Sequence, residues 1–279
     1  MQNGKKTVCW KIAVFLVLLN AIGWIGWWIA SSDGSVEARD LGTLVWLIGP
    51  LIVSLVIRLI SRDWDDIGIG FTFKGNWRWY IYSFLIFPVI IGLLLLIGFI
   101  FSSLSFSSFR AGTFISALGA SLVFTVVKNI AEEFSWRGFM TPKVKKLIPL
   151  VPAGHLVTGI FWGLWHIPYY LALLDRGALE GYTSIRMAVF LPMVILGITL
   201  SGVLFGEIRL VTGSVWPGVL MHTVSNLLTV TLLTGNHIAF SGKTEILFTP
   251  GWHGIIFMIV ISLAGCMVYG KRKAREKSS

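Results

Sequence analysis

Eight long stretches of apolar residues divide this chain, and short polar segments separate them. A helix needs about 20 mostly apolar residues to cross the hydrocarbon core of a bilayer, and each stretch has about that length. The stretches cover about residues 12–30, 42–60, 79–102, 111–134, 155–174, 187–206, 215–234 and 252–270. The longest connections, about 61–78 and 235–251, leave no room for a separate soluble domain. The pattern predicts an all-α, polytopic membrane bundle of about eight transmembrane helices, which forms a single domain over residues 1–279.

The overall composition supports this prediction and excludes other classes of protein. Of the 279 residues, 55% are hydrophobic and 13% are charged, whereas about 25% of a typical soluble domain is charged. This composition excludes a disordered chain and argues against a water-soluble globule. Two cysteines are too few for a disulfide-stapled secreted domain.

The positive charges predict how the helices are oriented, because loops on the cytoplasmic side of a membrane are enriched in Lys and Arg. If the N-terminus is cytoplasmic, seventeen of these residues fall on the cytoplasmic side. They are Lys5, Lys6, Lys11, Arg58, Arg62, Lys74, Arg78, Arg137, Lys143, Lys145, Lys146, Arg209, Lys271, Arg272, Lys273, Arg275 and Lys277. Five fall on the other side, namely Arg39, Arg110, Arg176, Arg186 and Lys243.

This asymmetry predicts that both termini are cytoplasmic. It also explains the formal net charge of +10 without a nucleic-acid partner. The sequence shows no organelle address, so we expect an integral protein of a bacterial plasma membrane, with membrane lipids around it.

Polar and ionisable residues within the apolar stretches gather in the fourth, fifth and seventh stretches. Such residues are costly inside a bilayer and tend to mark functional sites. They are Lys128, Glu132, Glu133 and Arg137 in the fourth, His166 in the fifth, and His222 and Asn226 in the seventh. We therefore expect the functional site within residues 111–234.

Helical spacing predicts which of these side chains face each other. Residues four apart share a helix face, whereas adjacent residues point about 100° apart. Glu133 should therefore pair with Arg137, and Glu132 should face a different sector as the free carboxylate. Lys128 lies four residues before Glu132 and could neutralise it. His222 and Asn226 are also four apart and should face one cavity.

Depth along the helices gives a second indication. At about 1.5 Å per residue, Glu132 and His222 each lie about 10 Å from the predicted cytoplasmic side, and His166 lies about 17 Å from it. Helices that run in opposite directions thus place their polar groups at similar depth. We expect one water-containing cavity in the cytoplasmic half of the bilayer, because these groups are least costly when they face each other and water.

The ordered motifs of these three stretches resemble those of the CPBP intramembrane proteases. This family contains the type II CAAX prenyl endopeptidases and the Abi-like, bacteriocin-processing proteins. The motifs read Glu132-Glu133-Phe134-Ser135-Trp136-Arg137, then Trp162 four residues before His166, then His222-Thr223-Val224-Ser225-Asn226. The segment Gly213-Ser-Val-Trp-Pro-Gly also looks like the family. The second motif departs from the family pattern, because Trp162 stands where the family has Phe.

The resemblance implies an intramembrane endopeptidase, a hydrolase without a cofactor. Glu132 would act as a general base on a water molecule, a role that suits a carboxylate in a poorly solvated cavity. His166 would place the water or the scissile carbonyl. Glu133 with Arg137 would orient the first carboxylate.

The remaining motif residues would act on the substrate. His222 and Asn226 would donate hydrogen bonds to the developing oxyanion, a contribution that can be worth about 10²–10³ in rate. Trp162 and Trp165 would form the substrate pocket. The substrate would be a peptide, or a prenylated or otherwise lipid-associated protein, cut near the cytoplasmic side.

Two other readings remain open at the level of sequence. Glu132, His166 and His222 could instead bind zinc, since two imidazoles and a carboxylate form a known catalytic ligand set. Against zinc, the His-Glu-x-x-His signature is absent. Outside enzymes, the same residues could serve a non-catalytic bacteriocin-immunity protein or a transporter-like pathway.

Overall fold

The computed structural model describes residues 2–148 and 150–278, and most of them are helical. Eight long helices match the eight apolar stretches in order. They are α1 (Gln2–Ala30), α2 (Val36–Ser61), α3 (Phe73–Ile100), α4 (Ala111–Ser135), α6 (Val151–Trp165), α8 (Met187–Thr212), α9 (Trp216–Thr234) and α11 (Ile255–Ser278).

Length and hydropathy identify seven candidate membrane spans in the described part of the chain. Among the long helices, α9 is the exception, because its 19 residues include His222, Asn226 and several threonines. The prediction of an all-α, polytopic membrane bundle is confirmed.

Short elements continue or connect the long helices. A π-helical turn, η1 (Trp136–Met140), carries α4 into α5 (Thr141–Leu147), and a second, η2 (Tyr169–Leu173), extends α6. The other elements are α7 (Arg176–Tyr182), η3 (Gly242–Thr244), α10 (Glu245–Phe248), and the strands β1 (Leu104–Ser105) and β2 (Ala239–Phe240), which pair antiparallel.

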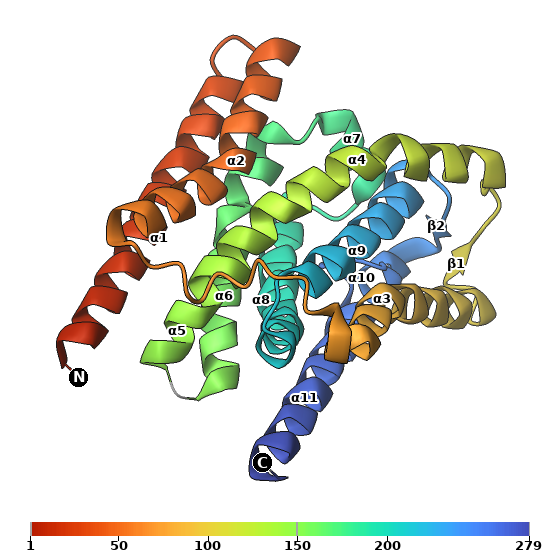
Figure 1. Ribbon diagram of the computed structural model, residues 1–279. Helices are drawn as coiled ribbons and strands as arrows, with labels where there is room; N and C mark the ends of the chain where they lie inside the picture. The colour runs from red at the N-terminus through yellow and green to blue at the C-terminus, as the bar shows by residue number, and fades with distance from the viewer. Residues whose placement is uncertain (1, 149, 279) are drawn as a thin grey trace.

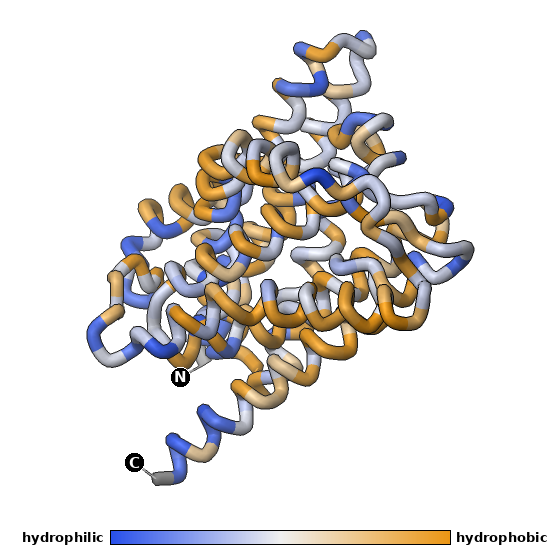
Figure 2. Tube along the Cα trace, turned by 90° about the vertical axis from the view of Figure 1, so that its right-hand side faces the viewer, coloured by the Kyte–Doolittle hydropathy of each residue, from blue (hydrophilic) through white to orange (hydrophobic). Residues whose placement is uncertain are grey.

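Figure 1 shows that the N- and C-termini lie towards one end of the bundle, while the α1–α2 turn and α7 lie at the other. Hydrophilic residues gather at the two ends of the trace and hydrophobic residues fill much of the length between them (Figure 2). We call the end with the termini the inner end and the end with α7 the outer end. These names describe the fold and carry no assumption about the membrane.

Small residues let α6 lie against α8, and this contact positions the helix that carries His166. A Cβ atom at Gly159 would come 2.4 Å from the backbone oxygen of Thr199, closer than any side chain can approach. Interfaces between membrane helices are enriched in small residues for this reason. On the same interface the His155 ring contacts the Glu207 carboxylate at 3.1 Å, which fixes α6 at its inner end.

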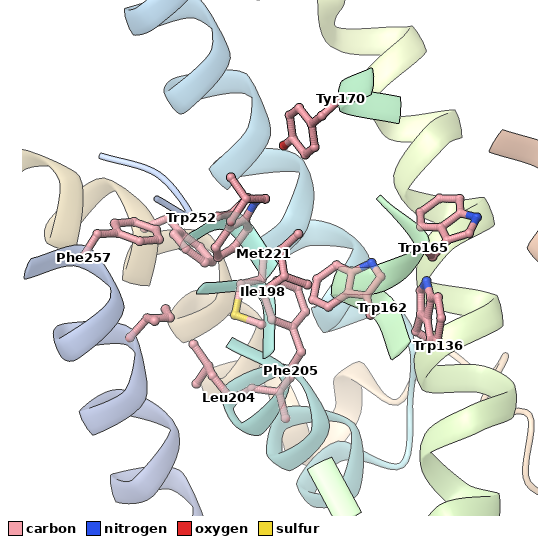
Figure 3. Packing of buried hydrophobic residues seen from close by; sticks show 14 of the residues in the cluster. Trp136, Trp162, Trp165, Tyr170, Ile198, Leu204, Phe205, Met221, Trp252 and Phe257 are labelled. Atoms are coloured by element: carbon pink, nitrogen blue, oxygen red, sulfur yellow. The ribbon is translucent and has the colours of Figure 1, made fainter. Parts of the chain in front are cut away.

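Aromatic side chains fill the core between these helices and the candidate site. Trp136, Trp162, Trp165 and Phe205 are all at least 98% buried, and Figure 3 shows them packed between α4, α6 and α8. This tightly packed aromatic cluster lies next to the polar residues of the candidate site and holds their helices in place.

Candidate active site

A cavity of about 420 Å³ lies between α2, α4, α6 with η2, α7 and α9. Its innermost wall contains the polar residues that the motifs identify: Lys128, Trp162, His166, His222 and Asn226. The predicted meeting of three motif helices around one cavity is therefore present in the structure. The chemical roles of these residues remain predictions.

Glu132 lies directly behind this wall and is fully buried. Its Oε1 accepts a hydrogen bond from the Lys128 ammonium at 2.5 Å, and its Oε2 accepts one from the indole N–H of Trp162 at 2.9 Å. The expectation of a free carboxylate that faces the cavity is therefore wrong for this arrangement. A carboxylate buried here needs a charge partner, and Lys128, one helical turn away, supplies it.

Glu133 forms a separate ion pair, as its spacing predicts. Its Oε1 accepts a hydrogen bond from Arg137 at 3.1 Å and lies 3.0 Å from Nδ1 of His222. Gly218 makes room for the same carboxylate, because a Cβ atom there would lie 2.9 Å from Oε2. The contact with His222 is an addition to the sequence prediction: Glu133 orients a histidine of another helix as well as pairing with arginine.

The two histidines are held by one ring nitrogen each. His166 lies with Nδ1 2.8 Å from the backbone oxygen of Trp162, while its Nε2 lies 4.0 Å from Oε2 of Glu132. Because a carbonyl oxygen can only accept, Nδ1 of His166 carries a proton. The same reasoning applies to Nδ1 of His222 beside the Glu133 carboxylate. In both rings Nδ1 makes the contact that fixes the ring, and Nε2 is the other nitrogen. Of the two, only His222 is held by a carboxylate, the arrangement found in Ser-His-Asp triads.

Asn226 is joined to a residue that the sequence analysis passed over. Its amide donates to Oδ1 of Asn129 at 3.1 Å, and Lys128 donates to the same oxygen at 3.2 Å. Asn129 is fully buried, and its own amide donates to the Thr223 hydroxyl at 3.3 Å. A sequence signal existed, since Asn129 lies four residues before Glu133 and shares its helix face.

The two tryptophans predicted to form the pocket occupy different places. Trp162 lines the cavity, but Trp165 is not among its lining residues. Trp165 instead stacks on Trp46 with ring centroids 4.0 Å apart, and its backbone oxygen accepts the indole N–H of Trp46 at 2.9 Å. Trp46 of α2 takes the wall position, next to Tyr169. No residue of the second apolar stretch was predicted to belong to the site, because a lone Trp at mid-helix gives no signal of this contact.

The alternative zinc site can be tested by the positions of its ligands. Throughout residues 2–148 and 150–278, no group of three or more His, Cys, Asp or Glu side chains is close enough together to hold a metal ion. Both Glu132 oxygens accept hydrogen bonds, and His222 uses Nδ1 on Glu133. The donor set does not fit zinc as it is arranged.

The cavity leads from the polar wall to the outer end of the bundle. Its outer rim includes Arg39, Asp175 and Thr234, and Arg39 binds Asp175 across the rim at 2.7 Å. The backbone N–H of Ala178, together with Arg39, lowers the pKa of Asp175, so this carboxylate stays ionised at the mouth. The sequence predicted cleavage near the side with most of the positive charges, whereas these rim residues belong to segments with few of them.

Comparison with known proteins supports the resemblance seen in the motifs. Residues 114–228 match a sequence family described as "Type II CAAX prenyl endopeptidase Rce1-like". The chain is also 24% identical over 246 residues to "Uncharacterized protein YyaK" of Bacillus subtilis (strain 168), a match that covers 85% of this chain and 77% of the relative. The family match includes all the motif residues from Glu132 to Asn226. Over residues 114–228 the chain is thus similar to the Rce1-like type II CAAX prenyl endopeptidases.

Proposed function

We propose that this protein is an intramembrane endopeptidase in which Glu132 activates water to hydrolyse a peptide bond. The observation that carries the proposal is that His166, His222 and Asn226, from two helices, line the closed end of one cavity, while Glu132 of a third helix lies directly behind them, 4.0 Å from Nε2 of His166. The similarity of residues 114–228 to the Rce1-like family supports the same reaction class. The substrate is a polypeptide, either free or lipid-associated. The candidate membrane spans and the similarity to a protein of Bacillus subtilis support an integral membrane protein of a bacterium, which we place in the plasma membrane.

The proposed reaction needs no covalent intermediate and no metal. Glu132 takes a proton from water, the hydroxide adds to the carbonyl carbon, and the amide C–N bond breaks as the proton passes to the leaving nitrogen. The developing oxyanion accepts a hydrogen bond from Asn226, whose amide has a second N–H beyond the one given to Asn129. His222 donates a second one through Nε2 when both of its ring nitrogens carry a proton, with Glu133 as the counter-ion. Preorganised donors of this kind account for a large part of catalysis in acyl transfer.

In this proposal Lys128 controls when the Glu132 carboxylate can accept a proton. Its ammonium occupies Oε1 of Glu132, so the carboxylate accepts a proton only when that contact loosens. The Lys128 side chain is 21% exposed while Glu132 is fully buried, and it lies on the cavity wall. A bound substrate can therefore reach Lys128 and draw the ammonium towards its own carbonyl groups.

The test is a comparison of wild-type cells with cells that carry Glu132→Gln. Gln keeps the shape and the hydrogen bond from Trp162 but cannot act as a base, so cleaved peptides should disappear from the membrane and the culture medium. Glu180→Gln is the matched control, because Glu180 is an exposed glutamate on α7. If Glu132→Gln leaves every wild-type cleavage product in place, the protein is a binder or a transporter. Cleavage by purified protein that stops on zinc chelation would overturn the metal-free mechanism.

A further inference from the structure

The lining of the cavity extends in one direction only from the polar wall. On α4 the lining residues run from Ser121 to Lys128, all before Glu132 in the chain. On α9 they run from His222 to Thr234. Because α4 and α9 run in opposite directions, both sets lead away from the catalytic cluster towards the outer end.

The other two long walls show the same direction. The α2 wall extends from Leu47 outwards to Arg39, at the start of that helix. The wall of α6 and η2 extends from Trp162 outwards to Leu174, and α7 continues it. The lining residues of all four helices thus lead to the outer end, which Figure 1 shows with α7 and the α1–α2 turn.

The opposite direction is closed by a tightly packed layer. The Arg137 guanidinium lies over the rings of Trp162 and Phe205, at 4.0 and 4.5 Å from their centroids. Trp136 and Phe139 beside it are fully buried. The residues that line the cavity all lie on the outer side of this layer in the described chain, so the layer separates the cavity from the inner end.

The distribution of charge identifies which side of the membrane the open end faces. By the order of the helices along the chain, five Lys and Arg residues lie in or near the connections at the outer end, and seventeen lie in the segments towards the inner end, which include both terminal segments. Cytoplasmic loops carry the excess of positive charge, so the inner end is cytoplasmic. The open end therefore faces the non-cytoplasmic side.

We propose that the cavity receives its substrate from the non-cytoplasmic side, and that the substrate is an extended polypeptide segment at that membrane surface. The identity of the substrate rests on the proposed protease function, while the direction of access does not. A volume of about 420 Å³ is in the range of pockets that enclose a small ligand, so it holds a few residues of an extended chain and excludes a folded domain.

The chemistry of the walls describes the segment that fits. Aromatic and aliphatic side chains such as Phe124, Tyr170 and Leu227 line the middle of the cavity, and the charged groups of Arg39 and Asp175 stand at its mouth. The segment should therefore place apolar residues beside the scissile bond and polar residues outside the membrane.

Thiol labelling tests the direction of access without any need for catalysis. Both native cysteines, Cys9 and Cys266, are free and exposed, so a background with Cys9→Ser and Cys266→Ser removes their signal. Single cysteines are then placed at Leu227 in the cavity, at Thr234 on its rim, and at the exposed Lys145 of α5 as the inner-end control. The probe is a small membrane-impermeant sulfonated methanethiosulfonate, applied to intact cells and to inside-out vesicles.

We expect Leu227→Cys and Thr234→Cys to react in intact cells, and Lys145→Cys to react only in inside-out vesicles. Adding Val230→Trp, which places a large ring in the cavity wall, should slow the reaction of Leu227→Cys about tenfold. Labelling of Leu227→Cys only from the cytoplasmic side, or from neither side, would overturn the proposal.

A second measurement separates this proposal from the proposed function. The labelling is repeated in the Glu132→Gln variant, where it should be unchanged, because access does not depend on the base. If Glu132→Gln abolishes processing, the lost cleavage sites should map to non-cytoplasmic segments of membrane or secreted proteins. Cleavage sites confined to cytoplasmic segments would overturn the access proposal and leave the protease function standing. Labelling as expected without any cleavage would overturn the protease function and leave the access proposal standing.

Discussion

Two arginine–carboxylate pairs, one at each end of the candidate site, differ in their surroundings. Glu133 and Arg137 are almost fully buried on the inner side, with side chains 0% and 1% exposed. Arg39 and Asp175 meet at the cavity mouth, with side chains 30% and 52% exposed. The same chemical pair closes the protein at one end and borders a solvent-accessible opening at the other.

The difference teaches what each pair contributes to the molecule. Removing one partner of a buried pair leaves an uncompensated charge and is strongly destabilising, whereas an exposed pair adds little because water screens it. The buried pair of Glu133 and Arg137 therefore stabilises the closed inner side of the site, and it also orients His222. The outer pair lies at the opening and can break and reform at little energetic cost.

The largest expected effect is the loss of stability when the buried pair of Glu133 and Arg137 is broken. Glu133→Gln should lower the free energy of unfolding by about 3–5 kcal/mol, because Arg137 then remains buried without its counter-ion. The measurement is thermal or denaturant unfolding of the purified protein in detergent. The double variant Glu133→Gln with Arg137→Met should recover part of the loss. An unchanged free energy of unfolding in the single variant would show that the buried pair does not stabilise the fold.

The second effect concerns His253, which lies at the outer end but away from water. It is fully buried beside Tyr182 and Phe190, and burial lowers its pKa to about 3. Above pH 6.5 this histidine is neutral in both states and costs nothing. Below pH 6.5 the unfolded chain gains the proton first, so stability falls by up to about 1.4 kcal/mol per pH unit until the pH reaches the folded-state pKa.

The check is unfolding as a function of pH between 7 and 4, with His253→Phe as the control. The variant should lack this part of the acid destabilisation. A parallel pH dependence in both proteins would mean that water reaches His253, and that the outer end is wet beyond the cavity.

A smaller effect is expected from blocking the cavity with a side chain that disturbs no packing. Val230 is 45% exposed and lines the cavity, while Val123 is 73% exposed and does not. Val230→Trp should reduce substrate processing about tenfold, equivalent to about 1.4 kcal/mol in the transition state, with unchanged melting. Val123→Trp should change neither. Equal activity of the two variants would place the substrate path elsewhere.

The smallest effect is expected at the mouth. Arg39→Gln should change the stability by less than about 1 kcal/mol, as is usual for exposed pairs. Its measurable consequence should be faster thiol labelling of Leu227→Cys, because the link between α2 and α7 is lost. Slower labelling would mean that the Arg39–Asp175 pair keeps the cavity open to solvent.

The sequence predicted the helices and the motif contacts well, because both depend on local periodicity. Long apolar runs specify membrane helices, and the spacing of four residues correctly paired Glu133 with Arg137. The ordered motifs also indicated that α4, α6 and α9 meet at one site. These features are set by residues close together in the chain.

What the sequence analysis missed depends on contacts between distant residues. The spacing allowed Glu132 either to pair with Lys128 or to stay a free carboxylate, and the complete burial of Glu132 by other helices decides for the pair. The exchange of Trp165 for Trp46 on the cavity wall requires the packing of α2 against η2, about 120 residues away. The cavity opens at the outer end because the outer halves of four helices lie apart there. The periodicity of apolar residues along each helix does not predict this.

The π-helical turn η1 has a consequence for how the chain tolerates insertions and deletions. It follows α4 directly at Trp136–Met140, and its wider backbone leaves the Arg137 and Gly138 carbonyls to accept hydrogen bonds from Arg209 and Arg58. A π turn contains one residue more than the regular α-helical path. Removing one residue there would rotate α5 by about 100° against the rest of α4 and would withdraw both carbonyls from their arginines. This stretch should therefore keep its length among natural relatives even where its side chains vary.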